Sequence, residues 1–340
     1  MEKRSVYILD YFLGYNGGVN LLVLEMKLII YMPALNEQEG IAEVIKSLPK
    51  EIEGIEEIKV LVVDDGSTDD TAKIAKESGA EVVSHAVNKG VGRAFQSAVQ
   101  YALEKGGDIL VSIDADRQFN SEQIPHIIQP ILNNKADMVT GNRFEKGIPL
   151  NMPKSKYWGN AQMSKLISLI TGQRFRDVSC GFRAYNREAL LRLNLFGAFT
   201  YTQESILDMV FKGLRVVEFP VEVIYFPQRK SRVAGSIVRY AFGTLNIILS
   251  TLRDYKPMVF FGGIGGILIF IGLVMEIFLG IHFLLSGDFT PFKFVGFTGF
   301  AFLVFGLLLV IVGMLANMFN RVRVNQEKIL YELKKERYED

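Results

Sequence analysis

A short apolar strand predicted at residues 109–113 runs directly into two aspartates, Asp114 and Asp116. Of all features of the sequence, this junction is the strongest indication of the fold. A continuous apolar run is typical of an inner strand of a parallel sheet, which is covered on both faces. In open α/β sheets, ligands bind in the crevice outside the carboxyl ends of the strands. Two carboxylates there suit a hard cation that holds a diphosphate, such as Mg²⁺ or Mn²⁺. On these residues alone, a turn at Asp114 and a helix cap at Asp116 explain the pattern equally well.

Three more predicted strands precede this one, and each also ends in a polar, acidic or glycine-rich loop. The strands cover residues 27–32, 58–65 and 80–85, and the predicted helices lie at 40–48, 70–78, 94–104 and, after the fourth strand, 121–133. Alternation of strands and helices at this spacing predicts a doubly wound, mostly parallel α/β sheet. Because the carboxyl ends of parallel strands meet at one edge, the four loops together predict a ligand site there.

The charged residues are unevenly distributed along the chain. Residues 258–319 are almost uncharged, and two stretches within them, about 258–285 and 294–319, each exceed the roughly 20 apolar residues that cross a bilayer. Positive residues flank both predicted transmembrane helices, so the positive-inside rule predicts that the α/β domain and both termini are cytoplasmic. Gly262 and Gly266 in the first span favour close helix packing or a homo-oligomer formed through the membrane helices.

The expected organisation has four parts after an N-terminal extension. They are an α/β domain at 26–235, an interfacial amphipathic helix at 236–257, the two membrane helices within 258–319 and a charged cytoplasmic helix at 320–340. Residues 1–25 show no signal-peptide pattern, and we assign them no function. The net charge of +1 gives no argument for nucleic-acid binding, so no nucleic-acid partner is expected. The one cysteine, Cys180, excludes an internal disulfide and fits a reducing compartment.

Five motifs follow one another along the α/β domain. They are PALNE at 33–37, VVDDGSTDDT at 62–71, NKGVGRA at 88–94, DADRQ at 114–118 and GNRF at 141–144. In this order they resemble family-two glycosyltransferases of the GT-A fold, and most of all the polyprenyl-phosphate sugar transferases, the group of dolichyl-phosphate mannose synthase. The resemblance covers about residues 27–235. It implies a membrane-bound, metal-dependent, inverting enzyme that moves a sugar from a nucleotide sugar to a polyprenyl phosphate such as dolichyl phosphate.

The resemblance also implies roles for individual residues. The nucleotide sugar would contact Pro33, Ala34, Glu37, Asp64, Asp65, Lys89, Gly90, Arg93, Asp114, Ala115, Asp116 and Gln118. The metal, Mg²⁺ or Mn²⁺, would be held by Asp114, Asp116 and Gln118. The acceptor phosphate would meet Arg143, Lys156, Asn160, Arg229, Lys230, Ser231 and Arg232. Catalysis would depend on Asp114, Asp116, Arg143, Arg229 and Arg232.

Four features leave alternatives open. Arg117 departs from the glycine or leucine usual in the family, and we expect it to face solvent rather than phosphate. The basic and aromatic segment 154–172 either packs on the sheet or rests as an interfacial helix on anionic headgroups. Glu276, within the first membrane helix, is either a functional acid or, as we prefer, a polar contact between helices. Cys180 is expected to pack rather than to react.

The resemblance implies a reaction without a strong general base. A phosphate monoester is mostly dianionic near neutral pH, because its second pKa is about 6. The positions of His85, His126 and His282, which lie at no motif, agree with this. The metal would offset the charge of the leaving diphosphate, and the cations that of the acceptor. UDP-sugars such as UDP-Glc or UDP-GlcNAc are favoured as donors, with GDP-mannose as the alternative.

Two other functions compete with this interpretation. A processive polysaccharide synthase usually carries a Gln-x-x-Arg-Trp element, but the only tryptophan here is Trp158, and two membrane helices are too few for a channel. A non-catalytic protein that binds nucleotide sugars in the membrane would have a degenerate site. The complete set of acidic motifs argues against this second alternative.

Overall fold

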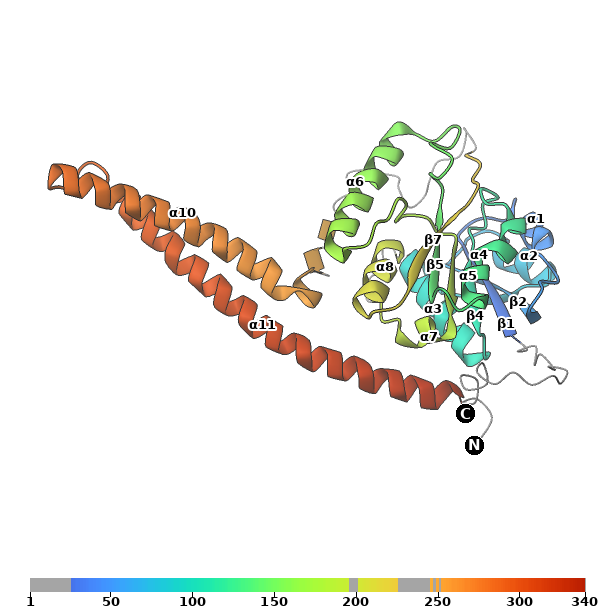
Figure 1. Ribbon diagram of the computed structural model, residues 1–340. Coiled ribbons are helices and arrows are strands. Elements are labelled where there is room, and N and C mark those ends of the chain that lie inside the picture. The colour runs from blue at the N-terminus through green and yellow to red at the C-terminus, as the bar shows by residue number, and fades with distance from the viewer. Residues whose placement is uncertain (1–25, 196–200, 226–244, 247–248, 251, 340) are drawn as a thin grey trace, which may run out of the picture.

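The computed structural model describes residues 26–195, 201–225, 245–246, 249–250 and 252–339. They form an α/β domain and a long two-helix hairpin that extends from one side of it (Figure 1). This arrangement confirms the expected order of an α/β domain followed by two long apolar helices. The positively charged loop expected at 229–232 and most of the amphipathic segment expected at 236–257 lie outside the described residues.

One seven-stranded sheet forms the centre of the α/β domain, with the order β3-β2-β1-β4-β6-β5-β7. The strands are β1 (Met26–Ala34), β2 (Ile55–Asp64), β3 (Glu81–Ser84), β4 (Ile109–Ser112), β5 (Met138–Asn142), β6 (Arg183–Asn186) and β7 (Val216–Pro220). Neighbouring strands are parallel, except that β6 runs antiparallel to β4 and β5. The predicted mostly parallel sheet is therefore confirmed, with one reversed strand that the sequence did not indicate.

Strand β1 divides the core into two layers, because its side chains point alternately to the two faces of the sheet. Leu28 and Ile30 pack in one layer and Ile29 and Tyr31 in the other, all fully buried. The first layer is covered by α1 (Ile41–Ser47), α2 (Thr71–Glu77), α4 (Ile124–Ile127) and α5 (Gln129–Leu132). The second is covered by α3 (Val91–Glu104), α6 (Lys154–Thr171), α7 (Arg187–Arg192) and α8 (Thr202–Phe211).

The single helix predicted at 121–133 is wrong. The segment forms a 3₁₀ turn at Ser121–Gln123 followed by two short helices, α4 and α5. Pro125 and Pro130 each lie in the first turn of one of these helices. Because proline has no N–H group and its ring clashes with the preceding turn, each proline ends the helix before it and begins another.

The hairpin consists of α10 (Pro257–Ser286) and α11 (Lys293–Glu339), and glycines let the two backbones approach. A Cβ atom at Gly265 would lie 2.6 Å from the carbonyl oxygen of Gly306, and one at Gly272 would lie 2.7 Å from that of Gly299. A Cβ atom at Gly266 would meet nothing within 4 Å. Close packing through small residues is therefore present. It joins the two helices of one chain, and it involves Gly265 and Gly272 rather than Gly266.

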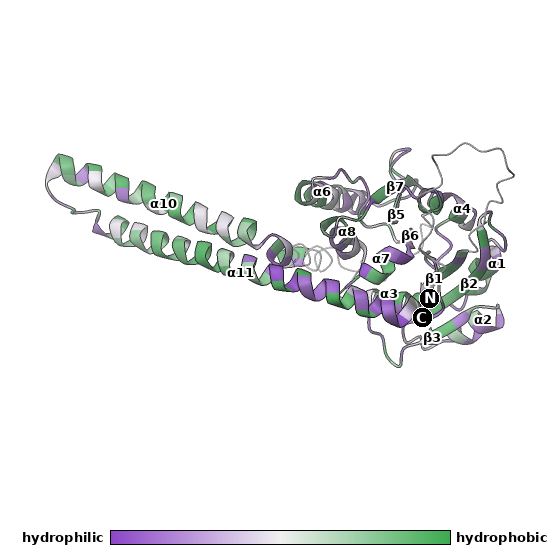
Figure 2. Ribbon diagram, turned by 60° about the horizontal axis from the view of Figure 1, so that its bottom comes forward, coloured by the Kyte–Doolittle hydropathy of each residue, from purple (hydrophilic) through white to green (hydrophobic). Residues whose placement is uncertain are grey.

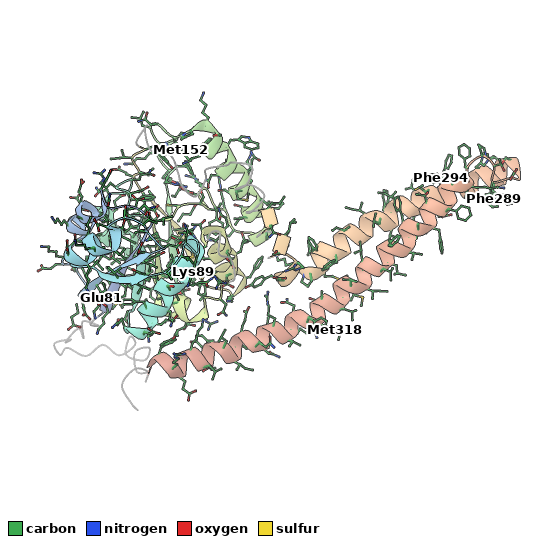
Figure 3. The ribbon with its side chains drawn as sticks, turned by 180° about the vertical axis from the view of Figure 1, so that it is seen from behind. Glu81, Lys89, Met152, Phe289, Phe294 and Met318 are labelled. Carbon is green, nitrogen blue, oxygen red and sulfur yellow. The ribbon has the colours of Figure 1, made fainter. Side chains whose placement is uncertain are left out.

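Both helices of the hairpin are long and apolar enough to cross a membrane by length and composition. Phe289 and Phe294 lie at the end of the hairpin farthest from the α/β domain (Figure 3). Glu276 faces the neighbouring helix, since a Cβ atom at Gly299 would lie 2.9 Å from its Oε1 atom. This position agrees with the helix-contact interpretation of Glu276.

Helix α11 continues without a break through the charged segment predicted at 320–340 and packs on the α/β domain. The hydroxyl of Tyr331 donates a 2.8 Å hydrogen bond to Glu188, and the guanidinium of Arg192 lies 4.8 Å from the centre of the Tyr331 ring. Lys334 Nζ donates to the carbonyl oxygen of Leu193 at 2.9 Å. The polar half of α11 thus runs beside the domain (Figure 2), and one helix joins the apolar hairpin to α7.

Candidate active site

Asp114 and Asp116 lie directly beyond the carboxyl end of β4, which is an inner strand of the sheet. Both are partly exposed, while Ala115 between them is 3% exposed. The Gln118 amide donates a 3.1 Å hydrogen bond to Asp116 Oδ1, which closes a tight turn around the second carboxylate. The Gln118 carbonyl accepts from the Ile224 amide at 2.8 Å. Hydrogen bonds of both the amide and the carbonyl of Gln118 therefore fix the turn. Its two carboxylates lie at the carboxyl edge of the sheet, where the sequence predicts a ligand site.

The donor set fits a divalent cation that a phosphate ligand completes. Within the described ranges, no group of three His, Cys, Asp or Glu side chains could hold a metal on its own. Mg²⁺ is usually held by one or two carboxylates, with substrate phosphates and water completing its coordination. Gly181 gives the Asp114 carboxylate its space, since a Cβ atom there would lie 3.2 Å from both of its oxygens.

Arg117 has an unusual backbone conformation within this tight turn. Its φ of 62° lies in the left-handed region, which a residue with a side chain adopts at a cost. Arg117 Nη1 lies 2.6 Å from Glu43 Oε2 on α1, and its side chain is 46% exposed. The expectation of a solvent-facing residue therefore holds in part, because the side chain also joins the turn to α1.

Asp65 has a structural partner for each of its oxygens. It accepts hydrogen bonds from the backbone amides of Lys89 at 2.9 Å and Gly90 at 2.8 Å, and His85 Nδ1 lies 2.7 Å from its Oδ1 atom. Gly90 has a φ of 90°, a value that favours glycine. Asp65 thus holds the loop at the start of α3. The sequence predicted a contact to base or ribose for Asp65, and it gave His85 no role.

The other predicted nucleotide residues come together around the ends of β1 and β2. Ala34 ends β1, and its carbonyl oxygen accepts from the Asp65 amide at 2.9 Å. Asp64 accepts from the Ser67 amide at 3.0 Å, and the Glu37 amide donates to Thr71 Oγ1 at 2.8 Å. The loops carrying Pro33 and Asp64 are thereby joined. Lys89, labelled in Figure 3, and Arg93 are both exposed.

Arg143 forms the centre of a buried network at the end of β5. Its Nε and Nη2 atoms donate to the Asp177 carboxylate at 2.6 and 2.8 Å. Nη2 also donates to Ser179 Oγ at 2.9 Å, and Nη1 donates to the hydroxyl of Tyr225 at 3.0 Å. Asn160 joins this network, because its Oδ1 atom accepts from Ser179 Oγ at 2.6 Å. Two residues that the resemblance places at an acceptor phosphate are thus held largely by protein groups.

Lys156 lies beside this network on the first turns of α6. Its Nζ atom is 5.9 Å from the centre of the Tyr225 ring. Burial and the nearby Arg143 lower the pKa of Lys156 from its ordinary value, while Asp116 opposes that shift. In the described part of the chain, no carboxylate forms an ion pair with it. Lys156 therefore brings a positive charge within electrostatic range of the Asp116 carboxylate.

Asp177 and Tyr225 are site residues that the sequence did not single out for these contacts. Asp177 is fully buried and binds Arg143, which is 34 residues away along the chain. Tyr225 is 8% exposed and lies beyond β7, at the same edge of the sheet. The signal that could have indicated Tyr225 is its place at the end of an apolar strand segment, where the other site residues also lie.

Comparisons with known proteins place these features in a family. The family model of glycosyl transferase family 2 matches residues 29–193. The chain is 32% identical over 235 residues to the UDP-N-acetylglucosamine–dolichyl-phosphate N-acetylglucosaminyltransferase of Methanococcus voltae, covering 62% of this chain and 92% of that protein. It is 28% identical over 223 residues to the undecaprenyl-phosphate mannosyltransferase of Micrococcus luteus, covering 63% of this chain and 90% of that protein.

A solved structure shares the fold. The glucosyl-3-phosphoglycerate synthase of Mycobacterium tuberculosis superimposes with a TM-score of 0.51 at 25% identity, covering 66% of this chain and 80% of that one. The matches to the two relatives named above cover 62% and 63% of this chain. Their likeness therefore extends over a part of the chain about as long as the α/β domain.

Proposed function

The chain belongs to glycosyl transferase family 2, and we propose that it moves a sugar from a nucleotide sugar to a membrane-borne polyprenyl phosphate, with inversion at the anomeric carbon. The observation that carries the proposal is the pair Asp114 and Asp116 at the carboxyl end of β4, in a chain whose C-terminal helices are apolar enough to span a bilayer. The named relatives act on dolichyl phosphate and undecaprenyl phosphate, which supports a lipid acceptor. A UDP-sugar is the favoured donor.

Asp114 and Asp116 would hold Mg²⁺ or Mn²⁺ together with the donor diphosphate, next to the Gln118 turn. When bound, such a cation offsets the charge that develops on the leaving diphosphate. The Asp65 carboxylate fixes the loop at Lys89 and Gly90, so that this loop borders the nucleotide pocket with Asp64 and Glu37. Its role would then be to position the loop rather than to contact the base.

The acceptor phosphate would meet Lys156 beside Asp116. Arg143 is bound by Asp177, so its contribution would be to add positive charge and to orient the hydroxyl of Tyr225. A phosphate monoester is mostly dianionic near neutral pH, so the attacking oxygen needs no proton acceptor. Contacts from Arg229, Lys230, Ser231 and Arg232, which lie outside the described residues, remain part of the proposal.

The catalytic domain and both termini would be cytoplasmic, where nucleotide sugars are available. Arg253 and Lys256 precede α10, and further basic residues occupy the end of α11 nearest the catalytic domain. The link between the helices, 287–292, carries one charge, Asp288. This asymmetry supports an orientation with the link on the far side of the membrane.

Reconstituted full-length protein tests the reaction directly. It would be incubated with labelled UDP-Glc, UDP-GlcNAc or GDP-mannose, with Mg²⁺ or Mn²⁺, and with either dolichyl or undecaprenyl phosphate. We expect one donor to place its label in a lipid product that carries a single inverted sugar. A growing polymer would indicate a polysaccharide synthase. Absence of both lipid product and donor hydrolysis with every donor would contradict the proposal.

Substitution of Gly181 by alanine is expected to weaken metal binding about tenfold, the scale of effects from groups that orient metal ligands. The added Cβ atom would lie 3.2 Å from both oxygens of Asp114 and would push that carboxylate aside. The measurement is the Mn²⁺ concentration for half-maximal transfer. Gly159→Ala is the matched control, because a Cβ atom there meets nothing within 4 Å. An unchanged Mn²⁺ requirement in Gly181→Ala would argue against Asp114 as a ligand.

Lys156→Arg is expected to move the alkaline loss of acceptor binding to higher pH. Burial and Arg143 lower the pKa of Lys156, so its charge is lost as pH rises at a lower value than for an ordinary lysine. An arginine keeps its charge throughout, since its pKa exceeds about 12. The measurement is KM for polyprenyl phosphate from neutral to alkaline pH, with Lys154→Arg as the exposed control. Identical pH profiles for wild type and Lys156→Arg would exclude this role.

A further inference from the structure

Helix α6 has one buried side and one exposed side. Asn160, Ser164, Ile167 and Ile170 face the domain. A stripe on the opposite side is exposed, and its residues follow one another at helical spacing: Lys154, Trp158, Gln162, Lys165 and Leu169. Trp158 is 67% exposed and Leu169 81% exposed. We call this set of five residues the α6 stripe.

Exposed apolar side chains of the catalytic domain are concentrated on α6 and in the loop that leads into it. Six large apolar side chains are exposed in its described part, 26–195 and 201–225: Val87, Ile148, Leu150, Trp158, Leu169 and Ile224. Four of the six lie on α6 or in the loop that leads into it. Contiguous exposed apolar groups rimmed by polar residues mark interaction sites.

The charged side chains of α6 all have one sign. Residues 147–175 contain no aspartate or glutamate but four lysines and arginines, whereas Lys146 and Arg176 beside them are paired with Glu222 and Glu145. Anionic headgroups complement such a segment, and each lysine or arginine near an anionic surface contributes about 1 kcal/mol to binding. The same face of a second copy would bring like charges together, so a symmetric dimer through α6 is disfavoured.

The end of α6 is attached at the point where the hairpin leaves the domain. Lys256 Nζ donates a 2.9 Å hydrogen bond to the carbonyl oxygen of Ile170, in the last turn of α6. Lys256 is the residue directly before α10. In Figures 1 and 2, α6 lies on the side of the domain from which the hairpin extends. The last turn of α6 is therefore held at the level where α10 would enter a bilayer.

We propose that the α6 stripe is the surface by which the catalytic domain rests on the bilayer that holds α10 and α11. Trp158 and Leu169 lie in the boundary between headgroups and acyl chains, and Lys154 and Lys165 meet anionic headgroups. Lys156 also lies in the first turn of α6. The inference requires membrane insertion of the hairpin but not sugar transfer, so the two proposals can fail separately.

Trp158 is the only tryptophan of the chain and therefore reports its own surroundings. Full-length protein would be placed in nanodiscs of phosphatidylcholine and phosphatidylglycerol, with bromine at shallow or deep acyl positions, and excited selectively at tryptophan. We expect shallow bromine to quench Trp158 more than deep bromine, and aqueous iodide to quench it weakly. Quenching by iodide with none by bromolipid would show a solvent-facing helix. Protection from both quenchers would show that protein covers the stripe, and either result overturns the proposal.

Charge reversal tests the contribution of the lysines. Lys154→Glu with Lys165→Glu is expected to remove about half or more of the bromolipid quenching in anionic nanodiscs, and less in purely zwitterionic ones. The matched control is Lys73→Glu with Lys76→Glu on α2, which is exposed on the opposite side of the domain (Figure 2). Equal quenching in both double variants would exclude an electrostatic role for the stripe.

Discussion

Asp116→Asn is expected to lower sugar transfer at least about a thousandfold, because a metal-site carboxylate accounts for several kcal/mol of charge stabilisation. Asparagine has nearly the shape of aspartate and keeps an oxygen that can accept the Gln118 amide, so the turn should persist. In the proposed reaction, the variant would lack a negative charge beside the cation and the diphosphate. The measurement is the initial rate of label transfer to lipid at saturating donor, acceptor and Mn²⁺.

A matched substitution separates this effect from a general loss of protein. Asp288→Asn removes an exposed aspartate in the link between α10 and α11, and its transfer rate is expected to equal that of wild type. Thermal unfolding with and without Mn²⁺ and UDP adds a second readout: the wild type should be stabilised, and the Asp116 variant should respond much less. Wild-type transfer by the Asp116 variant would refute the assigned metal site.

Asp177→Ala is expected to destabilise the catalytic domain by about 3–5 kcal/mol, the cost of removing one partner from a buried ion pair. Asp177 is fully buried, and the Arg143 side chain that it binds is 11% exposed. The substitution leaves the guanidinium without a counter-charge where little water can reach it. For a domain of this size, the midpoint of thermal unfolding should fall by roughly 10 °C.

Cys180 provides the readout, since it is the one cysteine and is fully buried. Burial raises the pKa of its thiol to about 12, so a thiol-reactive dye should react only when the domain opens. Asp137→Ala is the control, because its partner Arg215 is 47% exposed and can be solvated, which predicts a smaller loss. Arg143→Met combined with Asp177→Leu should recover much of the stability. Equal melting of wild type and Asp177→Ala would show that the pair contributes little.

Much of the catalytic sheet could be predicted because it depends on local pattern. The apolar runs at 109–113 and in β1 predict strands that are buried on both faces, and this signal comes from neighbouring residues alone. The length and near absence of charge of 258–285 and 294–319 predict helices of membrane-spanning length in the same way.

The reversed strand β6 could not be predicted in this way. Its Arg183 is fully buried, which no local pattern suggests for a charged residue. Its guanidinium donates to the carbonyl oxygens of Cys180 and Thr202, at 2.7 and 2.6 Å. These acceptors compensate for the loss of water, and they converge only after the chain has folded.

The residues of the candidate active site show the same difference between what local sequence predicts and what depends on the folded chain. Neighbouring residues alone indicate that acidic and glycine-rich loops follow the strands, because strand ends and turns have local sequence patterns. Which of these charged groups are bound by other protein groups depends on the folded chain. Asp65 accepts hydrogen bonds from the amides of Lys89 and Gly90, and Arg143 donates hydrogen bonds to Asp177. Lys156 lies near Asp116. Electrostatic partners are set by distance in space, and that distance bears no fixed relation to separation along the chain.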